Sequence, residues 1–420
     1  MNKTIFAVVL VALGLTLSAT STPADAAVRF CFKHNVDFID SGQELATSCS
    51  SFNPARCEDD WKTNDAYAAR GIRVKVEKQI NSVYTQIWYN YTDDGDGGDG
   101  AGCTPALDPA GANTGWYKIT LESRAKVKGN YIYSRNSSDE LATNTFVTYI
   151  STDGVTGTYS FTGSSSSLIL ERFNVLSAAS QAQWKVNLGL GLQWYYFRVL
   201  STSGQSSYNG TSGVVSISWD PLAPDQSAHR KFVISHELGH AVLHDILGSG
   251  YAGNTAWNDD GQGLGNDPLC ANGSHGVTSK EYLSGAGNEG FAHFYASAAF
   301  NNAGSNFNCY VHHWGRGTVN CASTGNDTAG YVEAFMNLEC GAGTVVGRGV
   351  ELDWWRAFWD VRTQGTPNLV SYSEMTSWLS GAGAWNNTNV YSILDAEANS
   401  VGGSLDAAWN AAEVDNGIAH

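Results

Sequence analysis

The chain has 420 residues and a formal net charge of −16 at pH 7, a length that suits two domains. This acidic balance argues against a nucleic-acid-binding protein, because a phosphate backbone requires a basic surface. It argues equally against binding to anionic lipid surfaces.

The N-terminal segment has the form of a secretory signal peptide. Lys3 supplies a charged start, residues 5–17 are an apolar run, and Ala24 and Ala26 flank Asp25 in a small-x-small cleavage site. The run is too short to span a membrane. We therefore predict cleavage after residues 1–26 and a secreted protein, extracellular or periplasmic, that is soluble and not membrane-bound.

Eight cysteines follow the apolar run. An even number of cysteines in an exported chain predicts disulfides. None is part of a C-x-x-C pair, so zinc binding by cysteine is not expected. Two bridges are expected in each half of the chain. The first half contains Cys31, Cys49, Cys57 and Cys103, and the second half contains Cys270, Cys309, Cys321 and Cys340.

Residues 27–162 have a β-strand pattern. The segments 71–80, 82–91, 116–134, 143–151 and 157–163 alternate or are rich in β-branched and aromatic residues, with Gly, Asn, Asp and Ser between them. Several short strands of this kind predict a β-sandwich-like accessory domain. Residues 163–167, "GSSSS", predict a flexible linker and a domain boundary.

A run of acidic residues between two of these strands is a candidate calcium site. Carboxylates clustered in one loop suit Ca²⁺, although the spacing does not fit an EF-hand. A polar, glycine-rich turn is the alternative interpretation. The residues are Asp93, Asp94, Asp96 and Asp99.

Residues 168–420 have a mixed pattern, which predicts an α+β domain. A helix is expected over 168–186, strands over 192–200 and 213–219, and a second helix over 228–247. Ser227 is a plausible N-cap for that second helix, and Gly248 is a plausible stop.

The second helix contains "HELGH", which matches H-E-x-x-H. His236 and His240 share one helical face, where two imidazoles can bind zinc, and Glu237 lies beside them to act on a water. His244 continues the spacing, but three residues four apart extend over about 12 Å of helix axis. That is too far for one ion, so we expect His244 to pack or to support the site.

Catalytic zinc usually takes three protein ligands, so a third must come from elsewhere. The segment "NEGFAHFYASAAF" over 288–300 predicts a helix with Glu289 in its first turn and His293 on the same face. Gly290 and Ala292 are small, which predicts a close approach to the first helix. We predict ligation by Glu289; a glutamate that merely begins a helix is the alternative.

"HELGH" and "NEGFAHFYA" together resemble the gluzincin metallopeptidases, the thermolysin-like clan, over about residues 213–300. The resemblance implies a zincin-like fold, His236, His240 and Glu289 as zinc ligands, and Glu237 as general base. Many members have an aspartate where this chain has His293, to orient a zinc-bound histidine. Asp353 or Glu351 could supply that acceptor here, although a charged helix face is the expected role of both.

The resulting hypothesis is a secreted zinc endopeptidase acting on protein or peptide substrates. Two alternatives remain: an adhesion or glycan-binding protein with a structural or vestigial metal site, and a zinc hydrolase with another substrate. Intact Glu237 disfavours a structural site, which needs no base. The oxyanion donor is left open among Tyr295, Tyr310, His312, His313 and Tyr331.

Overall fold

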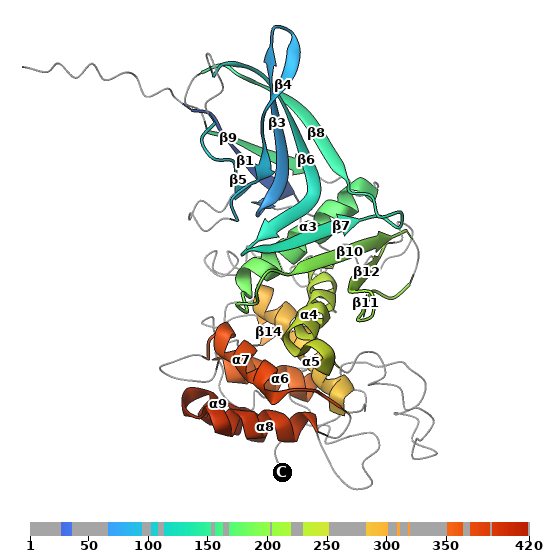
Figure 1. Cartoon of the computed structure of the whole chain (residues 1–420), viewed down its shortest axis with the longest axis vertical. Coiled ribbons are helices and arrows are strands. Elements are labelled where there is room, and N and C mark those ends of the chain that lie inside the picture. Colours follow the sequence, from blue (N-terminus) through green and yellow to red (C-terminus); the bar gives the residue numbers. More distant parts are fainter. Residues whose placement is uncertain are drawn as a thin grey trace, which may run out of the picture.

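The computed structural model describes residues 27–35, 66–94, 102–107, 113–152, 156–162, 168–201, 204–219, 230–251, 283–300, 309–310, 318–319, 351–363, 370–386 and 389–418. The predicted signal peptide and linker lie outside these residues, as do Asp96, Asp99, His312, His313, Tyr331 and the cysteines Cys49, Cys57, Cys270, Cys321 and Cys340. The described residues form an α+β structure with strands at one end and helices at the other (Figure 1).

A large sheet dominates the strand-rich end. Its order is β11-β12-β10-β7-β6-β3-β4, and β8 pairs with β6. The strands are β3 (Ile72–Ile80), β4 (Val83–Tyr91), β6 (Gly115–Val127), β7 (Asn130–Arg135), β8 (Thr143–Ile150), β10 (Trp194–Leu200), β11 (Ser207–Asn209) and β12 (Val214–Ser218). Burial alternates along β6 and β10, as expected for a sheet with one covered face.

This sheet crosses the predicted domain boundary. Strands β3, β4, β6, β7 and β8 precede residues 163–167, whereas β10, β11 and β12 follow them. The junction is a parallel pairing of β7 with β10, in which Tyr131 lies opposite Trp194. The boundary therefore does not separate two sheets. Pairing with β10 covers the edge that β7 would otherwise expose, so the predicted boundary falls within one continuous sheet.

A smaller sheet is built around β1 (Arg29–Asn35). Strand β1 pairs antiparallel with β2 (Ala66–Ala68) and β5 (Gly102–Cys103), and parallel with β9 (Thr156–Thr162). The ring of Phe30 lies 5.2 Å from that of Tyr117 in β6, between ring centroids. Phe30 and Tyr117 are fully buried. The small sheet therefore packs on the large one, and both share one hydrophobic core.

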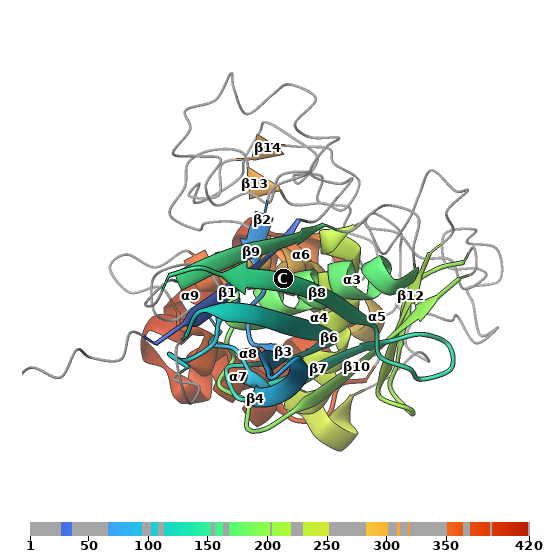
Figure 2. The same cartoon turned by 90° about the horizontal axis from the view of Figure 1, so that it is seen from above.

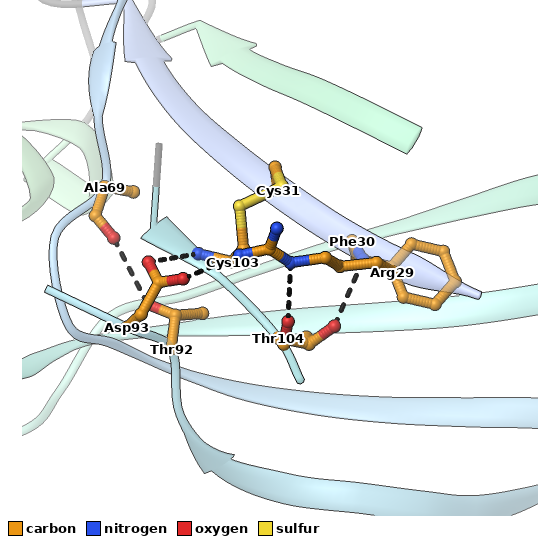
Figure 3. The surroundings of a disulfide bond; sticks show 8 residues. All are labelled: Arg29, Phe30, Cys31, Ala69, Thr92, Asp93, Cys103 and Thr104. Atoms are coloured by element: carbon orange, nitrogen blue, oxygen red, sulfur yellow. Dashed lines mark hydrogen bonds and ion pairs between the residues drawn. A yellow bond between two sulfur atoms is a disulfide. The ribbon is translucent and has the colours of Figure 1, made fainter. Parts of the chain in front are cut away.

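A disulfide joins Cys31 of β1 to Cys103 of β5, where the two residues face each other in the strand register (Figure 3). This is one bridge within the first half, as the sequence predicts, and it joins residues 72 positions apart. Such a long loop makes the bridge an effective restraint on the unfolded chain.

The first two aspartates of the candidate calcium loop bind protein donors. The Asp93 carboxylate pairs with Arg29 at 3.0 Å and accepts the Cys103 N–H at 2.8 Å (Figure 3). The Asp94 carboxylate accepts the Lys128 N–H at 3.0 Å. These contacts give both residues a structural role. Calcium binding at this loop stays a prediction, since Asp96 and Asp99 lie outside the described residues.

Two long helices connect the sheet to the helical end. Helix α3 (Leu168–Lys185) packs on β6, β7 and β10, and α4 (Lys231–Leu247) packs on β11 and β12. Both helices lie beneath the large sheet when it is viewed from above (Figure 2). The α3 helix confirms the prediction for residues 168–186, because its span differs by one residue.

The remaining described elements follow α4 in the chain. They are a short 3₁₀ turn (Gly248–Gly250), α5 (Leu283–Phe300), β13 (Cys309–Tyr310), β14 (Thr318–Val319), α6 (Glu351–Thr363), α7 (Tyr372–Ala382), α8 (Val390–Val401) and α9 (Gly403–Asp415). Helix α5 packs between α4 and α6, and α6 in turn packs on α9. Every residue of α5 is buried, as expected for a helix at the centre of a core.

Among the described residues, no helix has the length and apolarity that crossing a membrane requires.

Candidate metal site at the junction of three helices

Helix α4 places two histidines of the H-E-x-x-H motif one turn apart. It begins at Lys231, three residues later than the sequence predicts, and no side chain caps it at Arg230. It ends as predicted at Gly248, whose positive φ of 56° suits glycine. His240 is buried and His236 is partly buried. Both therefore face the interior of the helical end and not solvent.

The three predicted ligands converge. The Nε2 atoms of His236 and His240 are 3.2 Å apart. The two carboxylate oxygens of Glu289 lie 2.9 Å from His236 Nε2 and 3.1 Å from His240 Nε2. Glu289 is only 2% exposed, so a buried carboxylate faces both imidazole Nε2 atoms, one with each oxygen.

Helix α5 differs from the sequence prediction at its start. It begins at Leu283, so Glu289 lies in its second turn and not at its N-terminus. The predicted position of Glu289 in the first turn is therefore wrong, and the helix dipole, whose effect is confined to that turn, does not stabilise its carboxylate. What holds Glu289 in place is the packing of α5 between its two neighbours.

Two small residues of α5 allow that packing, in different directions. A Cβ on Gly239 of α4 would lie 2.8 Å from the Cα of Ala292, which confirms the close approach of α4 at Ala292. Gly290 instead faces α6, since a Cβ there would lie 2.4 Å from the Cβ of Trp354. The prediction that Gly290 faces α4 is therefore wrong. Gly239 sets the spacing between α4 and α5, and Gly290 sets the spacing between α5 and α6.

The protonation of the cluster suits a metal ligand set. Burial lowers the pKa of His236 to about 4, and the nearby His293 contributes in the same direction. Burial opposes ionisation of Glu289, but hydrogen bonds and charge from His240 and His236 outweigh it and hold its pKa well below the usual range. At neutral pH His236 is neutral and Glu289 is a carboxylate, which are the forms that bind metal ions.

The donor atoms also have the spacing that one ion requires. Ligand atoms about 2.1 Å from a tetrahedral zinc ion lie about 3.4 Å from one another, close to the separations of 2.9 to 3.2 Å found here. Two facing imidazole nitrogens cannot form a hydrogen bond with each other when both carry a proton or when neither does. A cation between them would satisfy both nitrogens and the buried carboxylate at once, so the residues fit zinc.

A fourth side chain, His293, adjoins the cluster. One donor atom each from His236, Glu289 and His293 lies within 4.8 Å of the others. This wider group also has the composition of a metal site. The tighter spacing of the set that includes His240 makes that set the better candidate for the first three ligands.

His293 is held by α6. Its Nε2 lies 3.2 Å from the Glu351 carboxylate, and its ring lies 5.2 Å from that of Trp355, between centroids. Glu351 and Asp353 are each 1% exposed, so the expectation that they form a charged, solvated helix face is wrong. Glu351 supports His293, and the buried Nδ1 of His236 has no hydrogen-bond partner among the described residues.

Glu237 follows His236 in α4 and is 7% exposed. Tyr251, which follows the 3₁₀ turn, lies close to it: burial raises the Tyr251 pKa above its usual range, and the charges of Glu289 and Glu237 contribute. No motif marks Tyr251 in the sequence, because its neighbours are rich in Gly and Asn. Its ring and hydroxyl therefore belong among the residues around the candidate site.

Other candidates of the sequence analysis lie elsewhere. His244 stacks on Tyr251, with centroids 4.8 Å apart, and its Nδ1 contacts the Tyr208 hydroxyl. It packs outside the metal cluster, as its spacing predicts. Tyr295 is buried in the core and bonds Gln183, which removes it as an oxyanion donor. The side chain of Tyr310 lies outside the described residues.

No model of a known protein family matches the chain, and no curated protein is similar to it. The function is therefore inferred from the site and from the two motifs.

Proposed function

We propose that this protein is a secreted zinc endopeptidase with a zincin-like catalytic domain of the gluzincin type. The observation that carries the proposal is the convergence of His236, His240 and Glu289. Their donor atoms lie 2.9 to 3.2 Å from one another in a buried site. This His-His-Glu set is typical of hydrolytic zinc sites, which keep a position for water.

In this mechanism each residue has a separate task. His236, His240 and Glu289 would hold the ion, which when bound acidifies a water and polarises the scissile carbonyl. Glu237 takes the proton from the attacking water on its carboxylate and passes it to the leaving amine. The burial of Glu237 limits competition from bulk water. The helices α4 and α5 keep base and ligands in fixed relation through the contact of Gly239 with Ala292.

The buried general base favours an enzyme over a structural metal site. Glu237 is adjacent to a ligand histidine and is 7% exposed. A structural zinc site is closed by its ligands and gains nothing from an additional buried carboxylate, which costs desolvation energy. Proton transfer gives a buried carboxylate at this position a function.

The test is zinc content and casein hydrolysis of the Glu237→Gln variant. We expect the variant to bind zinc like the wild type and to lose at least about 100-fold in hydrolysis, the usual scale for a general base. Asp245→Asn on the same helix is the control, since Asp245 lies outside the cluster and its loss should leave hydrolysis intact. A zinc-loaded Glu237→Gln protein with normal turnover would refute the proposal.

The alternative of a glycan-binding protein has one feature in its favour. Four aromatic rings form a row on β7 and β10, with the planes of Tyr133 and Tyr196 within 17° of each other. Trp194, whose ring contacts those of Tyr131 and Tyr133, is 51% exposed. Rows of this kind also stabilise neighbouring strands. Wild-type protein that binds zinc, cleaves no denatured protein and is retained on polysaccharide columns would favour this alternative.

A further inference from the structure

The contact between His293 and Glu351 has the form of a metal-site support. A histidine that binds a metal through one ring nitrogen almost always donates its other N–H to a carboxylate, a carbonyl or water. His293 places Nε2 3.2 Å from the Glu351 carboxylate. With the proton on Nε2, the lone pair is on Nδ1. Glu351 thereby leaves His293 with a nitrogen suited to binding a cation.

Burial makes this contact specific. His293 is 5% exposed and Glu351 is 1% exposed, and buried polar groups of this kind are costly unless they are compensated. The two residues come from different helices, 58 positions apart in the chain. His293 also packs against His236, with ring centroids 4.3 Å apart. The pair therefore joins α6 to the ligand cluster directly.

The geometry places His293 just outside the three tight ligands. Its donor atom belongs to a group spanning at most 4.8 Å, whereas ligands of one tetrahedral ion lie about 3.4 Å apart. His293 lies one helical turn after Glu289 on the buried helix α5, so both side chains face the same region.

We propose that His293 is a fourth protein ligand of the metal and that Glu351 orients it. This inference rests on the proposed metal site. The ion would then be held by three histidines and one glutamate, and the water used in hydrolysis would bind as a fifth ligand, a coordination number that catalytic zinc can reach in the transition state. Glu351 would hold the tautomer that carries the proton on His293 Nε2.

Cobalt(II) titration of the full-length protein tests this directly, because the visible absorbance of Co²⁺ depends on its ligands. The informative variants are His293→Phe, which keeps a ring against Trp355, and Glu351→Gln, which keeps the shape. His244→Phe and Asp353→Asn are their controls. Burial raises the pKa of Asp353 to about 8, so its amide resembles the form already present at neutral pH.

We expect His293→Phe to change the cobalt spectrum and to weaken cobalt and zinc binding by more than about 100-fold, beyond the range typical of a supporting residue. Glu351→Gln should weaken binding by about 10- to 100-fold with a similar spectrum, and the two controls should match the wild type. Circular dichroism confirms that each variant is folded.

Two results would overturn the inference while leaving the proposed function intact. One is wild-type spectrum and affinity in His293→Phe. The other is weaker binding with an unchanged spectrum, which would place His293 outside the coordination sphere. If instead the wild type binds neither cobalt nor zinc, or if Glu289→Ala binds them unchanged, the proposed hydrolytic site itself is wrong.

Discussion

Two buried histidine sites in this molecule have different chemistry. His34 of β1 is fully buried against α3, where its Nδ1 contacts the Ser177 hydroxyl. His240 is buried and His236 is partly buried against α5, where both contact the Glu289 carboxylate. Burial lowers the pKa of His34 to about 3 and that of His236 to about 4, so both imidazoles are neutral at pH 7.

The difference lies in the carboxylate. A neutral imidazole with a hydroxyl partner leaves no charge inside the protein, so His34 needs no ion. Glu289 adds a buried negative charge, which is costly unless a cation or strong donors compensate it. Burial of a histidine therefore indicates packing, whereas burial of histidines around an ionised carboxylate indicates a metal. In the region around His34, the disulfide between Cys31 and Cys103 cross-links two strands. In the helical region, the bound ion would cross-link the helices instead.

The largest expected effect removes the covalent link near His34. Replacing both Cys31 and Cys103 with alanine should lower the free energy of unfolding by about 4 kcal/mol, as chain entropy predicts for the loop of 72 residues. Denaturant unfolding of the metal-free protein measures the change. Equal free energies of unfolding for the variant and the wild type would show that the disulfide contributes little to the stability of the region around His34.

Removal of the buried carboxylate should abolish tight zinc binding. Glu289→Ala takes away one ligand and the charge that favours a cation, so zinc affinity should fall by more than about 100-fold, which is about 2.7 kcal/mol. Competition with a graded chelator measures it. Ser177→Ala is the matched control at the other histidine site and should bind zinc like the wild type; a similar loss in both variants would contradict the comparison.

The neutral state of His34 should make stability depend on pH. Its folded pKa of about 3 is below the unfolded value, so the unfolded state binds more protons as the pH falls from 6.5 to 3. The contribution of neutral His34 to the free energy of unfolding is complete above pH 6.5. It decreases as the pH falls below 6.5, by roughly 2 to 3 kcal/mol at pH 4.5. We therefore expect the free energy of unfolding of the metal-free wild type, relative to that of His34→Gln, to be smaller at pH 4.5 than at pH 7. The same relative value at both pH values would contradict the prediction.

The smallest effect tests the packing that positions the ligands. Gly290→Ala places a methyl group 2.4 Å from the Cβ of Trp354, so α5 and α6 must separate, at a cost of roughly 1 to 3 kcal/mol. Thermal unfolding measures the cost. Gly191→Ala is the control, because a Cβ there meets nothing within 4 Å. Equal melting temperatures for the two variants would show that the helix spacing tolerates a methyl group at Gly290.

Much of the candidate site could be predicted from local patterns. The spacing of His236 and His240 places them one turn apart on any α-helix, and the structure has that helix. The strand patterns likewise predicted β3, β4, β8, β9, β10 and β12 within a few residues of their ends, whereas the single predicted segment 116–134 covers both β6 and β7. These features depend on periodicity and on hydrogen bonds between near neighbours, which a sequence displays directly.

Contacts between distant segments were decided by the tertiary structure. The pairing of β7 with β10 across the predicted boundary and the contact of His293 with Glu351 depend on which surfaces can be buried together. Helix α5 begins earlier than its motif indicated because its first residues, though rich in glycine, are fully buried. The sequence by itself determined which residues can bind a metal. Packing decided which carboxylate reaches which histidine, since burial energy is shared by the whole core and no local pattern encodes it.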